Sequence, residues 1–191
     1  GIPEEAEAFL LIDVDGNEKN VANDISRIDA LCSENSALKT SIAKTDDERD
    51  ALWDVRKSVS ISLFKIASMK FNDDFCVPRS KVREVLKKVY ELSKTYSIQV
   101  AAFGHIGEGH IHLNVIYNEG KEVDLSVHKL VSQILKEVVS IGGTITSEHG
   151  VGDAKAEFLE LELAPHEIEI MRDLKKMFDP KDIMNPGKIF V

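Results

Sequence analysis

The sequence has few cysteines: Cys32 and Cys76 are the only two among 191 residues. Two widely spaced cysteines cannot form a disulfide framework or a zinc site with four cysteine ligands. This scarcity favours a reducing compartment. We therefore expect a cytoplasmic protein, or one that partner subunits hold at the inner membrane.

Long apolar runs and an excess of basic residues are also missing. No apolar run approaches the roughly 20 residues that a transmembrane helix needs, so we expect no transmembrane segment. Acidic residues outnumber basic ones by 33 to 24, which gives a formal net charge of −9. Such a surface repels nucleic acids and anionic lipids on average, so we expect neither as the main partner.

Glycine-rich nucleotide-binding motifs are absent as well. Neither the Rossmann fingerprint nor the P-loop pattern occurs, so we expect no nucleotide-binding domain within these residues. The sequence begins with Gly1 instead of methionine, from which we expect it to be part of a longer protein.

What the sequence does have is a dense group of histidines. Three of the six, His105, His110 and His112, lie within eight residues, around two glycines. Alternate residues of a strand share a face, so His110, His112 and Asn114 are predicted to face one side while the apolar residues between them enter a core. The glycines of the preceding turn permit a sharp reversal that brings His105 toward the same side.

Two interpretations of this strand remain open. Histidines with a nearby carboxylate suit zinc or a similar divalent ion with open coordination positions. Alternatively, the histidines form the polar face of an edge strand and contact only water.

A second motif places Glu148 and His149 between a double glycine and Gly150-Val-Gly152. Neighbouring residues of a regular strand face opposite sides, so both reach one cavity only if the glycines bend the chain. The alternative is a solvated loop. Together with the histidine strand, the motif completes a set of donors for a metal site, with His149 as a base outside the coordination shell.

Two cations are further candidates. Arg56 lies on a helix predicted to start at a capping box formed by Thr45 and Glu48, and Lys70 begins a predicted strand. If both face the metal, they would hold a carboxylate, which guanidinium groups bind through two parallel hydrogen bonds. A surface arginine and a solvated lysine are the ordinary alternatives.

Periodicity predicts alternating strands and helices. The predicted strands cover residues 8–14, 38–43, 70–77, 98–103 and 110–117, and the predicted helices cover residues 18–32, 45–67, 79–92, 123–141 and 164–178. The last helix is expected to bury Ile168, Met171, Leu174 and Phe178. Because two strands form a hairpin, we predict an α+β fold over residues 1–191, with helices packed on one face of a ferredoxin-like antiparallel sheet.

Three ordered motifs resemble a known family. They are Gly104–His112, Glu148–Gly152 and Asp179–Lys188, which resemble Gly-His-x-Gly-Asp-Gly-Asn-x-His, Glu-His-Gly-x-Gly and Asp-Pro-x-x-Ile-x-Asn-Pro-Gly-Lys. The family is the C-terminal, substrate-side domain of FAD-linked oxidases related to vanillyl-alcohol oxidase, in the branch of glycolate oxidase, D-lactate dehydrogenase and D-2-hydroxyglutarate dehydrogenase. This chain departs from the pattern at Glu108, where aspartate is usual, and at His110, where asparagine is usual.

The resemblance implies a role for each matching residue. It makes His105, His112 and Glu148 ligands of a divalent metal, with zinc expected, and His149 the catalytic base. It makes Arg56, Ser60, Lys70 and Asn114 substrate-binding residues, with Ser60 in the place of a threonine, and Asn185 a cofactor-binding residue.

The implied function is oxidation of a small D-2-hydroxy acid of the glycolate or D-lactate type to the 2-oxo acid, with hydride transfer to FAD. In this family an N-terminal domain binds the FAD, so we expect that domain as a partner and expect no activity from this chain alone. Other oxidase subunits or a second copy are further expected partners. The alternative is a non-catalytic metal-binding or subunit-interaction module that retains the fold.

Overall fold

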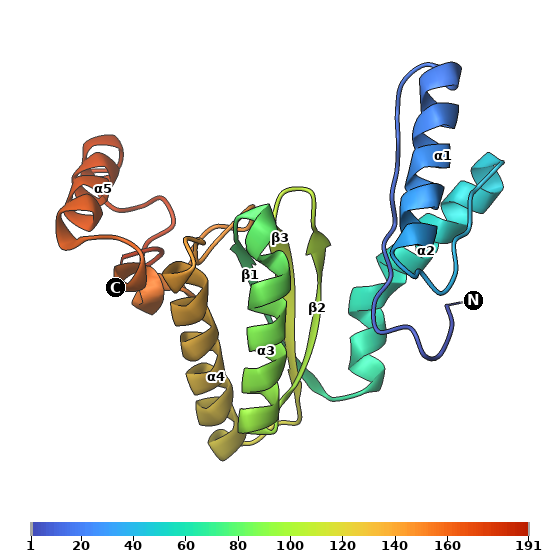
Figure 1. The fold of residues 1–191 in the computed structure, drawn as a ribbon. Helices are drawn as coiled ribbons and strands as arrows, with labels where there is room; N and C mark the ends of the chain where they lie inside the picture. Colours follow the sequence, from blue (N-terminus) through green and yellow to red (C-terminus); the bar gives the residue numbers. More distant parts are fainter. Residues whose placement is uncertain (1, 191) are drawn as a thin grey trace. The chain divides into compact units, whose positions relative to one another are not determined.

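The computed structural model describes residues 2–190, except for the side chains at positions 121 and 122. The chain divides into two compact units, Gly1–Ser62 and Leu63–Val191 (Figure 1). None of the helices in the described residues is long and apolar enough to cross a bilayer.

The first unit contains two helices, α1 (Glu18–Glu34) and α2 (Asp46–Ser62). The predicted cap of α2 is confirmed, because the backbone N–H of Glu48 donates to the Thr45 hydroxyl at 3.2 Å. The Glu48 carboxylate accepts from the Lys44 N–H at 2.6 Å, one residue before the position that a capping box implies. The helix ends before the predicted limit at residue 67, and a 3-10 turn, Leu63–Lys65, follows.

Two predicted strands of this unit are wrong. Residues 8–14 and 38–43 have no regular secondary structure, and Phe9, Leu10 and Leu38 are exposed. A short apolar run fits a strand pattern, but a strand also needs a partner for its backbone hydrogen bonds. Neither segment pairs with a strand of the described sheet.

The second unit is built on three antiparallel strands, β1 (Met69–Cys76), β2 (Gln99–His105) and β3 (His110–Tyr117). Their order is β1-β3-β2, so the histidine strand β3 is central. Helices α3 (Val82–Tyr96) and α4 (Lys121–Ser140) lie side by side on one face of the sheet (Figure 1). The predicted α+β class, the hairpin and the one-sided helix layer are thereby confirmed.

The succession β1-α3-β2-β3-α4 matches the first five elements of the ferredoxin-like β-α-β-β-α-β plan. In that plan a fourth strand pairs with the free edge of β1. Here a single antiparallel bridge occupies the position, with Cys76 and Thr144 exchanging backbone hydrogen bonds of 3.1 and 2.8 Å. After this bridge the chain turns irregular and runs into a 3-10 helix, Ala156–Leu161.

The core lies between the sheet and the two helices. The apolar residues of β3 that were predicted to enter a core are buried, and α3 buries Val82, Val85 and Val89 against them. From α4, Leu130 and Ile134 complete this layer. The histidines therefore lie on the face of the sheet opposite α3 and α4.

The last helix, α5 (Pro165–Phe178), lies within one residue of its predicted range, 164–178. Its predicted core face is only partly correct: Ile168 is buried, whereas Leu174 is exposed and Phe178 is 80% exposed. Helical spacing identifies residues that share a face, but it does not say whether another element covers that face.

Candidate metal centre

The β2–β3 hairpin brings three histidines together. His105 ends β2, His110 begins β3, and the two are direct partners in the register. The ring centroids of His110 and His112 are 4.2 Å apart, and those of His105 and His110 are 5.4 Å apart. Of the two turn glycines, Gly109 has a positive φ of 76°, and an added Cβ would lie 1.9 Å from the Val77 carbonyl oxygen. Only glycine fits there.

The loop after the Thr144 bridge adds a carboxylate and a fourth imidazole. Glu148 Oε1 lies 3.5 Å from His112 Nε2 and 3.4 Å from His149 Nε2. Gly150 and Gly152 both have positive φ angles, of 73° and 59°. The predicted bend of the chain is confirmed, and both Glu148 and His149 reach the histidine face.

Four residues of this region form a candidate metal site, the His/Glu cluster: His105, His110, His112 and Glu148. One ligand atom from each lies within 4.8 Å of those from the others. Three imidazoles and a carboxylate suit zinc and related divalent ions. The cluster contains all three ligands that the sequence predicted, adds His110, and does not include His149.

The alternative of an exposed edge strand is wrong. On the histidine face of β3, His110 is 3% exposed and Asn114 is 2% exposed. The pKa of His112 is lowered, first by burial and next by the neighbouring His110, against an opposing effect of Glu148. A neutral imidazole keeps the lone pair that a metal ligand needs, and Glu148 leaves one side of the cluster open to solvent. The residues therefore fit a divalent ion.

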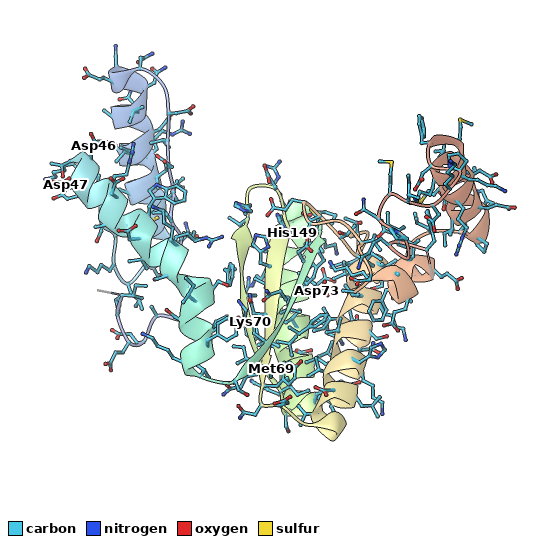
Figure 2. The ribbon with its side chains drawn as sticks, turned by 180° about the vertical axis from the view of Figure 1, so that it is seen from behind. Asp46, Asp47, Met69, Lys70, Asp73 and His149 are labelled. Carbon is cyan, nitrogen blue, oxygen red and sulfur yellow. The ribbon has the colours of Figure 1, made fainter. Side chains whose placement is uncertain are left out.

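The remaining predicted residues of the sheet share this face in part. Lys70 and Asn114 both project to the histidine side, by alternation from Asp74 and His112, which are direct partners in the register. Figure 2 shows Met69, Lys70 and Asp73 in order along β1, with His149 beyond Asp73. The Lys70 ammonium lies 5.1 Å above the Phe64 ring. The Asn114 amide donates to the Ala101 carbonyl at 3.4 Å. Their binding roles stay predictions.

Arg56 and Ser60 lie on α2 in the first unit, and their part in substrate binding also stays a prediction. Asn185 lies in the C-terminal segment with a positive φ of 50°. Asparagine tolerates this conformation better than most residues. The backbone conformation alone therefore accounts for an asparagine at position 185. Its predicted cofactor-binding role stays a prediction.

The C-terminal motif packs against the loop that carries Glu148 and His149. The Ile189 N–H donates to the Gly152 carbonyl at 2.6 Å, and Lys188 forms an ion pair with Asp153. The hydrogen bond from Lys188, a backbone hydrogen bond and the charge of Lys188 lower the pKa of the Asp153 carboxyl. The tail therefore fixes the glycine end of the loop.

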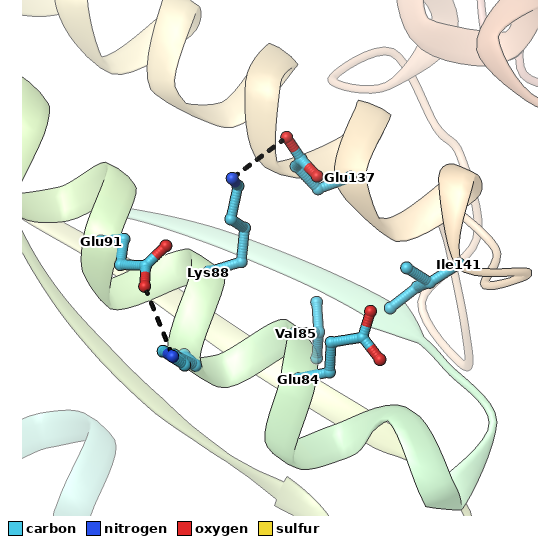
Figure 3. A pocket seen from close by; sticks show the side chains of 7 residues that line it. Glu84, Val85, Lys88, Glu91, Glu137 and Ile141 are labelled. Atoms are coloured by element: carbon cyan, nitrogen blue, oxygen red, sulfur yellow. Dashed lines mark ion pairs between the residues drawn. The ribbon is translucent and has the colours of Figure 1, made fainter.

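Another hollow lies on the helix side of the sheet, between α3 and α4. It measures about 250 Å³ and is lined by Glu84, Val85, Lys87, Lys88, Glu91, Glu137 and Ile141 (Figure 3). Its charges are paired: Lys88 lies 3.8 Å from Glu137, and Lys87 lies 4.0 Å from Glu91. Because these pairs neutralise one another and no histidine lines the hollow, the candidate site stays on the other face.

Sequence reasoning missed three buried charged residues beside the cluster. Asp73, Asp74 and Lys155 are all buried, and Lys155 contacts both carboxylates. The available signal was the pair of adjacent aspartates inside a strand pattern bounded by Phe71 and Phe75. Charged residues are seldom fully buried unless they are paired.

Comparison with known proteins identifies the family of this chain. The family model for the C-terminal domain of FAD linked oxidases matches residues 1–189. The chain is 36% identical over 191 residues to glycolate oxidase subunit GlcD of Bacillus subtilis (strain 168), covering all of this chain and 41% of that protein. It is 37% identical over 153 residues to a D-lactate dehydrogenase of Archaeoglobus fulgidus, covering 80% of this chain and 33% of that protein.

A third relative is glycolate oxidase subunit GlcD of Escherichia coli (strain K12), with 30% identity over 189 residues. This match covers 98% of the chain and 38% of the relative. The chain therefore spans between a third and about two fifths of the proteins that it resembles.

Proposed function

Because the chain belongs to the family of C-terminal domains of FAD linked oxidases, we propose that it forms the substrate side of a flavin-dependent D-2-hydroxy acid dehydrogenase. The substrate is a small acid of the glycolate or D-lactate type, which is oxidised to the 2-oxo acid. One observation carries the proposal: His105, His112 and Glu148 come from a hairpin and a distant loop, yet lie together with His149 at their side.

The His/Glu cluster is the proposed metal site. His105, His112 and Glu148 hold a divalent ion, with zinc expected. The bound ion supplies a positive charge that stabilises the alkoxide developing at the substrate hydroxyl. The lowered pKa of His112 supports this role, because the imidazole is ready to bind without first releasing a proton.

His149 is the proposed base. Its exposed ring lies 3.4 Å from Glu148 and outside the cluster, so its nitrogen can take the proton of the substrate hydroxyl. The substrate carboxylate is held by the cations Arg56 and Lys70, with Ser60 and Asn114 as further polar contacts. The side of β1 that Lys70 shares with the histidine strand supports this assignment.

FAD would supply the redox chemistry as the acceptor of the hydride from C2 of the substrate. An N-terminal domain of the same protein would hold the FAD, and Asn185 would contact the cofactor from this chain. The limited share of the relatives that this chain covers supports a division of labour between two domains. Other oxidase subunits or a second copy complete the assembly.

The test uses the full-length, flavin-loaded protein and reduction of an artificial dye. Glycolate, D-lactate and D-2-hydroxyglutarate are offered in turn, with L-lactate as the stereochemical control. We expect reduction with at least one of the first three and none with L-lactate. A flavin-loaded protein that reduces dye with none of them overturns the proposal.

The second candidate function is a non-catalytic metal-binding or subunit-interaction module. It is favoured by His110, a buried fourth donor where the related proteins are expected to have an asparagine. Metal analysis together with the dye assay separates the two: a protein that binds a divalent ion, holds flavin and reduces no dye supports this candidate.

A further inference from the structure

A buried lysine, Lys155, contacts two adjacent aspartates of β1, one of which lies on the same side of the sheet as the His/Glu cluster. Lys155 is 5% exposed, and its ammonium lies 2.6 Å from Asp73 Oδ1 and 3.0 Å from Asp74 Oδ1. It also donates to the Ile145 carbonyl at 2.9 Å. A buried ammonium with this set of acceptors is held in one place.

The two aspartates differ in what their second oxygen faces. In the register of β1 and β3, Asp73 is opposite Leu113 and so lies on the helix side, whereas Asp74 is opposite His112 and lies on the histidine side. Asp74 Oδ2 is 3.7 Å from His110 Nε2. Both atoms are buried, and neither has a hydrogen-bond partner among the described residues.

The other nitrogen of His110 faces the cluster. His110 Nδ1 lies 3.9 Å from Glu148 Oε2. A neutral imidazole has one N–H and one lone pair, so a proton on Nε2 leaves the lone pair of Nδ1 for a metal. Histidine ligands of metals regularly donate their second N–H to a carboxylate.

We propose that His110 is a fourth metal ligand through Nδ1, and that Asp74, held by Lys155, is the positioning residue that accepts its Nε2 hydrogen. The 3.7 Å separation is longer than a hydrogen bond, so the proposal requires it to shorten by several tenths of an ångström, to roughly 3 Å, when the metal binds. The inference rests on the metal binding in the proposed function. It adds a residue to that site and assigns a purpose to the buried Lys155.

Four protein ligands have a consequence for substrate binding. A tetrahedral zinc site with four protein ligands is closed, whereas catalytic zinc keeps a position for substrate and can expand to five ligands. A hydroxy acid therefore binds here only to an ion that takes at least a fifth ligand. Cobalt(II) is a suitable probe, because its visible absorption reports coordination number.

The experiment measures the Kd of cobalt and zinc by chelator competition on the full-length protein. We expect His110→Asn and Asp74→Asn each to raise the Kd by about 10- to 100-fold and to alter the cobalt spectrum. The double variant should bind no more weakly than His110→Asn, because Asp74 acts only through His110.

Asp73→Asn is the matched control. It removes a buried carboxylate that pairs with the same Lys155 but faces no histidine, so the Kd and the cobalt spectrum should stay unchanged. His128→Asn is the histidine control, since His128 pairs with Glu157 outside the cluster.

A measurement on the unsubstituted protein avoids any dependence on the folding of the variants. In the zinc-loaded protein, nitrogen-15 shifts of His110 should report a metal-bound Nδ1 and a protonated Nε2. The reverse assignment, or a His110 signal that zinc does not move, overturns this inference. A protein that binds neither ion overturns it together with the metal site of the proposed function, whereas tight binding that His110→Asn leaves unchanged overturns this inference alone.

Discussion

Both faces of the sheet bury residues of the central strand β3, but the residues on the two faces differ in chemistry. On the helix side, Phe75, Leu113 and Val115 are fully buried against apolar residues of α3 and α4. On the histidine side, His110 and Asn114 are almost as inaccessible. Burial alone therefore does not distinguish the core from the site.

The difference lies in how many of the buried groups are polar. On the helix side, Asp73 pairs with Lys155 and its Oδ2 also lacks a hydrogen-bond partner among the described residues, but the other buried side chains of the strands there are apolar, and their burial stabilises the fold. On the histidine side, Asp74 Oδ2 and His110 Nε2 have no hydrogen-bond partner among the described residues. Leaving such atoms unpaired costs about 1–3 kcal/mol each. A face that carries this cost without contributing to stability is a candidate for function.

The largest expected effect comes from His149, an exposed residue on the histidine side. We expect His149→Ala to lower turnover with a 2-hydroxy acid by about 10²- to 10⁴-fold, because it removes the proposed base. Metal content and thermal stability should stay unchanged, since His149 is exposed and outside the cluster.

Steady-state kinetics and metal analysis of the full-length protein check this prediction. His166→Ala, which removes an exposed histidine of α5, is the control and should leave turnover intact. A His149→Ala variant with full turnover would remove the base from the proposed mechanism.

The next largest effect is expected on the helix side of the sheet, where a substitution should affect stability more than metal binding. We expect Leu113→Ala to lower the free energy of unfolding by about 2–5 kcal/mol, because it leaves a cavity in a close-packed core. Its neighbour in sequence, His112→Asn, should cost less stability and yet abolish tight metal binding.

Denaturant unfolding and chelator competition on both variants test this reversal, with the metal Kd measured where each protein is fully folded. If Leu113→Ala weakens metal binding as strongly as His112→Asn does, then the two faces are not separable. The comparison would then fail.

A smaller effect should reach both faces at once through the β2–β3 turn. Gly109→Ala places a side chain at a φ of 76° and against the Val77 carbonyl. We expect a loss of about 1–3 kcal/mol in unfolding free energy, together with weaker metal binding as His105 and His110 move apart.

Gly107→Ala is the matched control, because Gly107 lies in the same turn with no atom within 4 Å of an added Cβ. It should change stability by less than about 0.5 kcal/mol. Equal losses of unfolding free energy in the two variants would mean that the stability of the hairpin depends on the turn as a whole and not on the conformation of Gly109.

Local patterns in the sequence predicted a large part of this architecture. Alternation placed His110 and His112 on one face, and glycines predicted the bend that brings Glu148 to them. Contacts between residues far apart in sequence were not predictable. The central position of β3 depends on its pairing with β1, and Lys155 contacts Asp74, which is 81 residues away in sequence. The same limit explains Phe178, whose helical position was correct but whose surroundings were not.

Asp179 in the tail sharpens the comparison, because it is a buried aspartate with both oxygens satisfied. Its Oδ1 accepts from the Ile183 N–H at 3.0 Å, and its Oδ2 accepts from the Met184 N–H at 2.8 Å and from Lys175. Unlike Asp74, it leaves no atom to bind anything else. We therefore assign it a structural role and expect Asp179→Asn to leave the metal Kd unchanged.

The smallest expected effect is the response of this tail to acid. Lys175 and the two backbone N–H groups lower the pKa of the Asp179 carboxyl below its usual value of 3.8. The unfolded tail thus binds a proton more readily, so the stabilisation is complete above pH 3.8 and is lost as the pH falls through the lowered pKa. Amide exchange of Ile183 and Met184, corrected for intrinsic rates, should accelerate only in that range. Asp179→Asn should remove this pH dependence, whereas the control Asp173→Asn, on the exposed side of α5, should preserve it. Amide exchange that is already fast at neutral pH would contradict the structural role of Asp179.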